Sequence, residues 1–131
     1  MTPQREEAER MLRLARRDQV AFNVLLAAPG VALPLALFHA QQAVEKALKA
    51  VMCLHRIEYR RTHDLEELAT QLANAGVSQC VDQTKLRRLT PYAVEFRYDD
   101  EPTQLLTGVE TQAVVVTLME WAEMQSSRRA P

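Results

Sequence analysis

The chain has 131 residues, of which 47% are hydrophobic and 25% are charged, and its formal net charge at pH 7 is −1. This length corresponds to one domain with a single core, and the near-neutral charge excludes a global field that would draw the protein to nucleic acid or to a membrane. Only three glycines are present and aromatic residues make up 5%, a balance that favours helices over sheets.

The sequence carries no pattern typical of secretion, membrane insertion or metal binding. The charged N-terminus lacks the apolar stretch of a signal peptide, and the apolar run 31–38 is too short to cross a bilayer. We therefore expect a cytoplasmic protein with no membrane contact. Cys53 and Cys80 lie in no zinc-ligand spacing and no glycine-rich phosphate loop is visible, so no metal and no cofactor are expected.

The N-terminal half predicts two long helices. Apolar residues at three- and four-residue steps indicate a first helix over 3–27. The segment 28–30 contains Pro and Gly and interrupts it. A second helix follows, with Pro34 in its first turn, where the missing N–H costs little, and ends near Arg56. Apolar positions cover half of this second helix, so we expect it to be central in the fold.

The C-terminal half predicts three more helices. Asp64 resembles an N-cap with Glu67 at the capping-box position, and a short third helix runs from there to a stop signal at 74–76. A fourth helix is expected over 82–98, kinked or split by Pro91, and a fifth over 106–125. Residues 126–131 are expected to be a disordered tail.

Together these elements predict an all-α fold, in which residues 1–125 form one antiparallel, up-and-down bundle of four long helices and one short helix. The first and fifth helices carry more apolar positions than one small core is expected to bury, which predicts a homodimer. The residues on which this expectation rests are Val114, Val115, Val116, Met119 and Trp121.

The most informative segment is 38–49, a strong helix former with a narrow polar stripe. At 100° per residue, four polar residues fall within about 100° of one another: Gln42, Glu45, Lys46 and Lys49. The two lysines are candidate phosphate ligands that the carboxylate would orient. The alternative is an ordinary solvated helix face.

Two further places are candidate binding sites. His63 and Asp64 lie at a predicted helix start, where free N–H groups suit an anion, and capping alone is the alternative interpretation. Arg97 and Tyr98 lie at the end of the fourth predicted helix. An arginine there also stabilises the helix dipole without any further role.

Three segments together resemble the HEPN family (higher eukaryotes and prokaryotes nucleotide-binding). They are FHAQQAVEKALKA at 38–50, THDL at 62–65 and Arg97-Tyr98, and their order and spacing cover nearly the whole chain. The resemblance implies an α-helical bundle that usually dimerises. Many prokaryotic members are encoded beside a minimal nucleotidyltransferase and act as toxin–antitoxin pairs. Some members are metal-independent ribonucleases, and others bind nucleotides, RNA or partner proteins without catalysis.

The ribonuclease members of the family carry an arginine followed by a histidine after four to six intervening residues. Residues 98–104 contain no histidine, and 99–101 are acidic, which would repel an RNA backbone. Arg56 and His63 have six residues between them but precede the third helix, outside the family's catalytic place. They remain secondary catalytic candidates, with His63 as general acid or base and Arg56 stabilising phosphorane charge.

The resemblance therefore favours a noncatalytic module that binds a nucleotide, RNA or a nucleotidyltransferase partner. The residues expected to carry this role are Gln42, Glu45, Lys46, Lys49, His63 and Arg97. Two alternatives stay open: a metal-independent toxin ribonuclease that acts on RNA, and a purely structural dimerisation bundle.

Overall fold

The computed structural model describes residues 2–94 and 105–128, and in these two ranges the chain is helical and contains no strand. The predicted all-α bundle is confirmed. Its elements are α1 (Pro3–Ala27), α2 (Leu33–Leu54), α3 (Leu65–Asn74), α4 (Gln83–Leu89), the 3-10 helix η1 (Thr90–Ala93) and α5 (Gly108–Arg128). The candidate residues Arg97 and Tyr98 lie outside the described residues. Within the described ranges no helix is both long and apolar enough to span a membrane.

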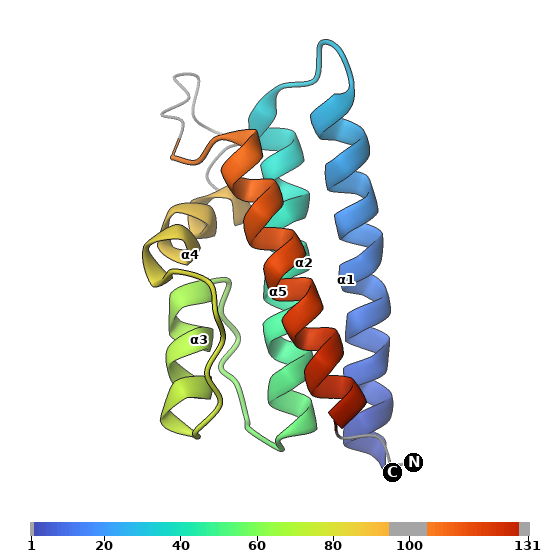
Figure 1. Ribbon diagram of the computed structural model, residues 1–131, viewed down its shortest axis with the longest axis vertical. Coiled ribbons are helices and arrows are strands. Elements are labelled where there is room, and N and C mark those ends of the chain that lie inside the picture. The colour runs from blue at the N-terminus through green and yellow to red at the C-terminus, as the bar shows by residue number, and fades with distance from the viewer. Residues whose placement is uncertain (1, 95–104, 129–131) are drawn as a thin grey trace.

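Helix α2 is the centre of the bundle and contacts every other helical element (Figure 1). Helix α1 covers one of its sides and runs antiparallel to both α2 and α5. Small side chains let α1 and α2 approach closely, and the alanines of this seam are fully buried: Ala8, Ala15, Ala36, Ala40, Ala43, Ala47 and Ala50. The sequence therefore predicted the central helix correctly.

The connection between α2 and α3, residues 55–64, returns along the side of α2. The amide Nε2 of Gln41, in the middle of α2, donates to the backbone oxygen of His63 over 2.9 Å. Helix α3 therefore begins beside the middle of α2 and runs in the same direction (Figure 1). Chain direction consequently does not alternate strictly from helix to helix, although α1 and α2, joined by a short loop, are antiparallel.

The fourth helix is much shorter than the sequence predicts. Helix α4 has seven residues and ends at Leu89, and the chain continues as the 3-10 helix η1, with Pro91 in its first turn. Proline has no N–H to continue the α-helical ladder, and a 3-10 turn tolerates the loss. The hydroxyl of Thr90 donates to the Leu86 carbonyl and accepts from the backbone N–H of Leu65, which joins this break to the start of α3.

Helix α5 extends three residues beyond its predicted end, so the expected disordered tail is wrong for 126–128. Ser126 is buried, and Nη2 of Arg5 donates to its carbonyl oxygen over 3.1 Å, which fastens the last turn of α5 to the first turn of α1. Of the five residues on which the dimer expectation rests, Val114, Val115 and Met119 lie in the core of one chain, Trp121 packs against this core and Val116 is exposed.

We expect Leu48→Ala to lower the free energy of unfolding by about 3 kcal/mol, because Leu48 is fully buried in the middle of α2. Chemical denaturation with urea, followed by circular dichroism, measures the change. Leu35→Ala is a matched control on the same helix, since Leu35 is 42% exposed, and its cost should stay below about 1 kcal/mol. Equal losses in the two variants would contradict the central position of α2.

Candidate functional site

The polar stripe of α2 is part of a hydrogen-bonded array that reaches α1 on one side and the 55–64 connection on the other. We call it the α2 array. Its members are Asp18, His39, Gln41, Gln42, Glu45, Lys46, Lys49 and His63. The polar stripe of α2 is therefore not an ordinary solvent-exposed helix face, because α1 and the 55–64 connection cover its edges.

The edge toward the connection is built on the carboxylate of Glu45, which is only 6% exposed. Its Oε1 accepts from Gln41 Nε2 over 3.1 Å and from His63 Nδ1 over 2.8 Å. Its Oε2 accepts from Lys49 Nζ over 3.0 Å. The same Lys49 ammonium lies 5.3 Å from the centroid of the Tyr59 ring, a cation–π contact with the connection.

The edge toward α1 is built on the carboxylate of Asp18. One oxygen accepts from Lys46 Nζ, and the other lies 3.2 Å from His39 Nδ1. Lys46 Nζ also lies 3.4 Å from the Gln42 carbonyl oxygen. Each carboxylate of the array thus has one lysine and one histidine as neighbours, which leaves little uncompensated charge among its buried members.

Two adjacent amides join the edges. Gln42 Nε2 donates to Gln41 Oε1 over 2.7 Å, and Gln41 Nε2 donates both to Glu45 and to the His63 carbonyl. Gln41 is fully buried, and both its nitrogen and its oxygen are hydrogen-bonded, as a buried amide requires. It is the residue that holds the connection against α2.

The hydrogen bonds keep Glu45 ionised. Burial raises the pKa of this carboxyl group, but the donors His63, Gln41 and Lys49 together outweigh burial, so that the pKa lies below its usual 4.5. An ionised carboxylate only accepts, so Nδ1 of His63 carries the proton in this contact. The side chain of His63 is 58% exposed. The array therefore orients a histidine toward solvent.

The structure brings together five of the residues predicted from the sequence, places Arg56 apart from them at the end of α2, and does not describe Arg97. Gln42, Glu45, Lys46, Lys49 and His63 are all members of the α2 array. The lysines are engaged by carboxylates, so a phosphate would have to compete with Asp18 and Glu45 for them. The main role of the α2 array is therefore to hold α1 and the 55–64 connection against α2.

The secondary catalytic candidates Arg56 and His63 do not form a pair. The backbone N–H of Arg56 donates to the Cys53 carbonyl in the last turn of α2, whereas His63 is bonded to Gln41. Cys53 and Gln41, the α2 residues to which Arg56 and His63 are bonded, are about 18 Å apart along the helix axis. One phosphate cannot contact both side chains in this arrangement.

Three members of the array were not predicted from the sequence: Asp18, His39 and Gln41. Gln41 had a local signal, because it precedes Glu45 by one helical turn. His39 likewise precedes Lys46 by two turns on the same side of α2. Asp18 had no local signal, since its contacts depend on how α1 and α2 are placed against each other. In the described part of the chain no group of three or more His, Cys, Asp or Glu side chains is placed to hold a metal ion.

We expect Glu45→Gln to lower the free energy of unfolding by about 3 kcal/mol at neutral pH, because it leaves the ammonium of Lys49, only 13% exposed, without a counter-charge. A carboxylate whose folded-state pKa is lowered stabilises the fold above its unfolded-state pKa, and this contribution is lost as the pH falls through the folded-state value. The difference between wild type and Glu45→Gln should therefore shrink below pH 4.5. Urea denaturation between pH 7 and 3 measures it.

Glu66→Gln is the control, because Glu66 pairs with the exposed Arg87 at the surface and its loss should cost less than about 1 kcal/mol. A difference between wild type and Glu45→Gln that grows on acidification would contradict the role of the ionised carboxylate.

Comparison with known proteins gives the family. No curated protein and no solved structure matches the chain at a significant level. The family model described as HEPN domain matches residues 5–124, a range that includes α2 to α4, η1 and most of α1 and α5 and contains every member of the α2 array. The chain therefore belongs to the HEPN domain family.

Proposed function

We propose that this HEPN domain is a noncatalytic module that binds a nucleotide or RNA through the connection between α2 and α3. Family membership implies a module related to nucleotides or RNA. The finer assignment rests on what the connection presents. Arg60 is 81% exposed and Arg61 is also exposed, and His63, the third exposed group, is oriented by Glu45.

The observation that carries the proposal is that these groups stand on backbone already held in place. Gln41 fixes the His63 carbonyl, and Asp64 caps α3 by accepting from the backbone N–H of Glu67. A preorganised cationic segment loses less conformational entropy on binding. Arginine in particular binds phosphate through two parallel hydrogen bonds. Nη1 of Arg60 forms an ion pair with Glu67 at 3.6 Å, and because the side chain is still 81% exposed the other N–H groups of its guanidinium can reach a phosphate.

The other residues expected from the sequence then have supporting roles. Glu45 and Lys49 hold the connection, while Gln42 and Lys46 lie at the partly exposed part of the array. Arg97 stays a proposed phosphate contact on the strength of the family resemblance alone.

Two observations favour binding without cleavage. The three histidines of the chain are His39, His55 and His63, so none follows Arg97 at the spacing of the ribonuclease members. Arg56 and His63 contact α2 at levels about 18 Å apart. A second candidate, the metal-independent ribonuclease, is favoured by one observation: the exposed imidazole of His63 is oriented by the carboxylate of Glu45, as the imidazole of a general base often is.

We expect the double variant Arg60→Gln/Arg61→Gln to weaken binding of a fluorescent single-stranded RNA. The slope of log K against log salt should become less steep by about 1.4, since each lost phosphate contact contributes about 0.7. Fluorescence anisotropy at several salt concentrations measures both quantities. Arg13→Gln/Arg88→Gln makes the same change in charge at exposed positions elsewhere and should leave the slope unchanged.

The same samples, incubated with EDTA and examined on a gel, separate the two candidate functions. Intact RNA supports the noncatalytic module. Cleavage that His63→Ala abolishes would establish the ribonuclease in its place, and an RNA affinity that is equal in all variants would leave the connection without the proposed role.

A second copy of the chain is the proposed partner on the α1–α5 side. Of the residues expected from the sequence only Val116 favours it. The apolar side chains that remain 40–79% exposed on these two helices are Val20, Val24, Val109, Val116 and Met124. The family resemblance adds a nucleotidyltransferase partner and a toxin–antitoxin role, which co-purification with the product of a neighbouring gene would test.

We expect the wild-type protein to be a dimer at micromolar concentration, and Val116→Lys to halve its mass, because an ammonium would be buried in the interface. Light scattering after size exclusion measures the mass. Val94→Lys serves as control, since Val94 is equally exposed at the end of η1. A monomeric wild type would refute the dimer.

A further inference from the structure

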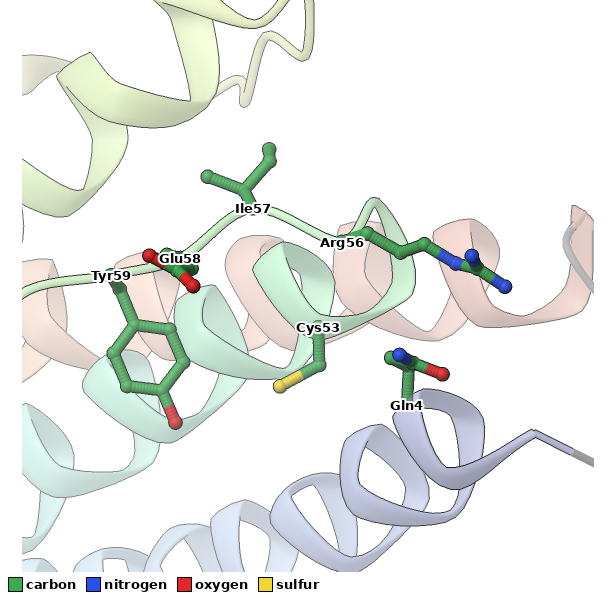
Figure 2. Close-up of a pocket in the computed structure, with 6 residues that line it drawn as sticks. All are labelled: Gln4, Cys53, Arg56, Ile57, Glu58 and Tyr59. Carbon is green, nitrogen blue, oxygen red and sulfur yellow. The ribbon is translucent and has the colours of Figure 1, made fainter.

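A hollow of about 470 Å³ lies at the C-terminal end of α2, away from the middle of the α2 array (Figure 2). Three segments line it: the first turn of α1, the last turn of α2 and the start of the connection. Its residues are Gln4, Cys53, Arg56, Ile57, Glu58 and Tyr59. In Figure 2, Arg56 and Gln4 lie on one side of the hollow and Tyr59 on the other, with Cys53 between them. The volume is within the range of small-molecule sites.

At this hollow the backbone holds Arg56 in a conformation that is unfavourable for any residue with a Cβ. The N–H of Ile57 donates to the Met52 carbonyl over 2.9 Å and the N–H of Arg56 to the Cys53 carbonyl over 3.1 Å, the hydrogen bonds of a Schellman motif. Arg56 occupies the left-handed position of this motif, with φ 57°. A side chain with a Cβ is disfavoured in that region.

The same chain ends another helix by the same motif without that strain. At the end of α3 the equivalent hydrogen bonds run from Val77 to Leu72 and from Gly76 to Ala73, both over 2.9 Å. The left-handed position is filled by Gly76, with φ 85°, the residue that this motif prefers. An arginine at the matching position of α2 is therefore kept at a conformational cost.

The side chain of Arg56 has no role within the described part of the chain that would account for this cost. It is exposed, and its guanidinium makes no ion pair or hydrogen bond with any residue in 2–94 or 105–128. Its charge does lie near the C-terminus of α2, whose last turn holds no basic residue, and a cation there stabilises the helix dipole. If Arg56 serves to bind a ligand, Arg56→Gly should lose affinity for that ligand and keep its melting temperature. If Arg56 only stabilises the helix dipole, the variant should keep its affinity and melt at a lower temperature.

We infer that the hollow binds a small organic phosphate, with the phosphate held by Arg56 and Gln4 and a planar ring lying against Tyr59. A guanidinium and an amide N–H together suit a phosphate monoester, and the face of an aromatic ring suits a flat, weakly polar body. Glu58 at the rim accepts hydrogen bonds from amino groups of such a ring. The choice of a nucleoside monophosphate as the probe rests on the proposed function.

The experiment is a titration of the full chain with AMP, followed by amide NMR shifts and by calorimetry, with inorganic phosphate and adenosine as partial probes. We expect the shifts to centre on 56–59 and AMP to bind more tightly than either part alone. Arg56→Gly should lower the affinity for AMP by at least about tenfold while leaving the melting temperature unchanged or higher, because it removes the strain. Arg88→Gln, at an exposed position on α4, is the control and should change neither quantity.

Two results would overturn the inference: AMP that does not bind, or an Arg56→Gly variant that binds AMP as the wild type does. A lower melting temperature of Arg56→Gly with unchanged binding would assign the arginine to the helix dipole instead. Arg56 and Tyr59 belong to the same connection, but the outcome is distinguishable from that of the RNA experiment. RNA binding that depends on Arg60 and Arg61 can hold while the hollow stays empty, and AMP binding that depends on Arg56 can hold while RNA does not bind.

Discussion

The buried carboxylate of Glu45 is the interaction on which the rest of the structure depends. It is ionised, nearly inaccessible to water, and bonded to donors from α2 and from the connection. Separating the connection from α2 would remove the contact of His63 and expose the buried amide of Gln41, a change that costs several kcal/mol in comparable buried networks. The start of α3 and the exposed arginines ahead of it are therefore held by Glu45 together with Gln41, both on the central helix.

This arrangement assigns binding and support to different residues. The lysines of the stripe neutralise Asp18 and Glu45, so they stabilise the bundle and are poor phosphate ligands. The exposed cations next to the α2 array, Arg60 and Arg61, lie on the connection, which has little hydrogen-bonded structure of its own and takes its shape from α2. The polar stripe of α2, which the sequence indicates as a binding site, thus mainly supports the neighbouring surface of the connection.

Local signals predicted most of the helices, and long-range contacts account for what was missed. The bounds of α1 agree with the apolar periodicity and the Pro–Gly break that follows it, and Pro91 correctly marked a break in the fourth helix. Helical geometry also placed Gln42, Glu45, Lys46 and Lys49 on one face. It did not indicate that residues 55–64 would return to cover that face, nor that Asp18 would approach it from α1, because both depend on how separate helices are placed in space.

Helix α1 begins, and α5 ends, at the same end of the bundle, where Arg5 is bonded to Ser126 (Figure 1). This is also the end at which Gln4 lines the hollow next to Arg56. An affinity tag or a fused domain attached at either terminus would therefore stand beside this hollow and crowd it. A circularly permuted chain, opened in the loop 28–32 at the opposite end and joined across the present termini, would carry its fusions away from it.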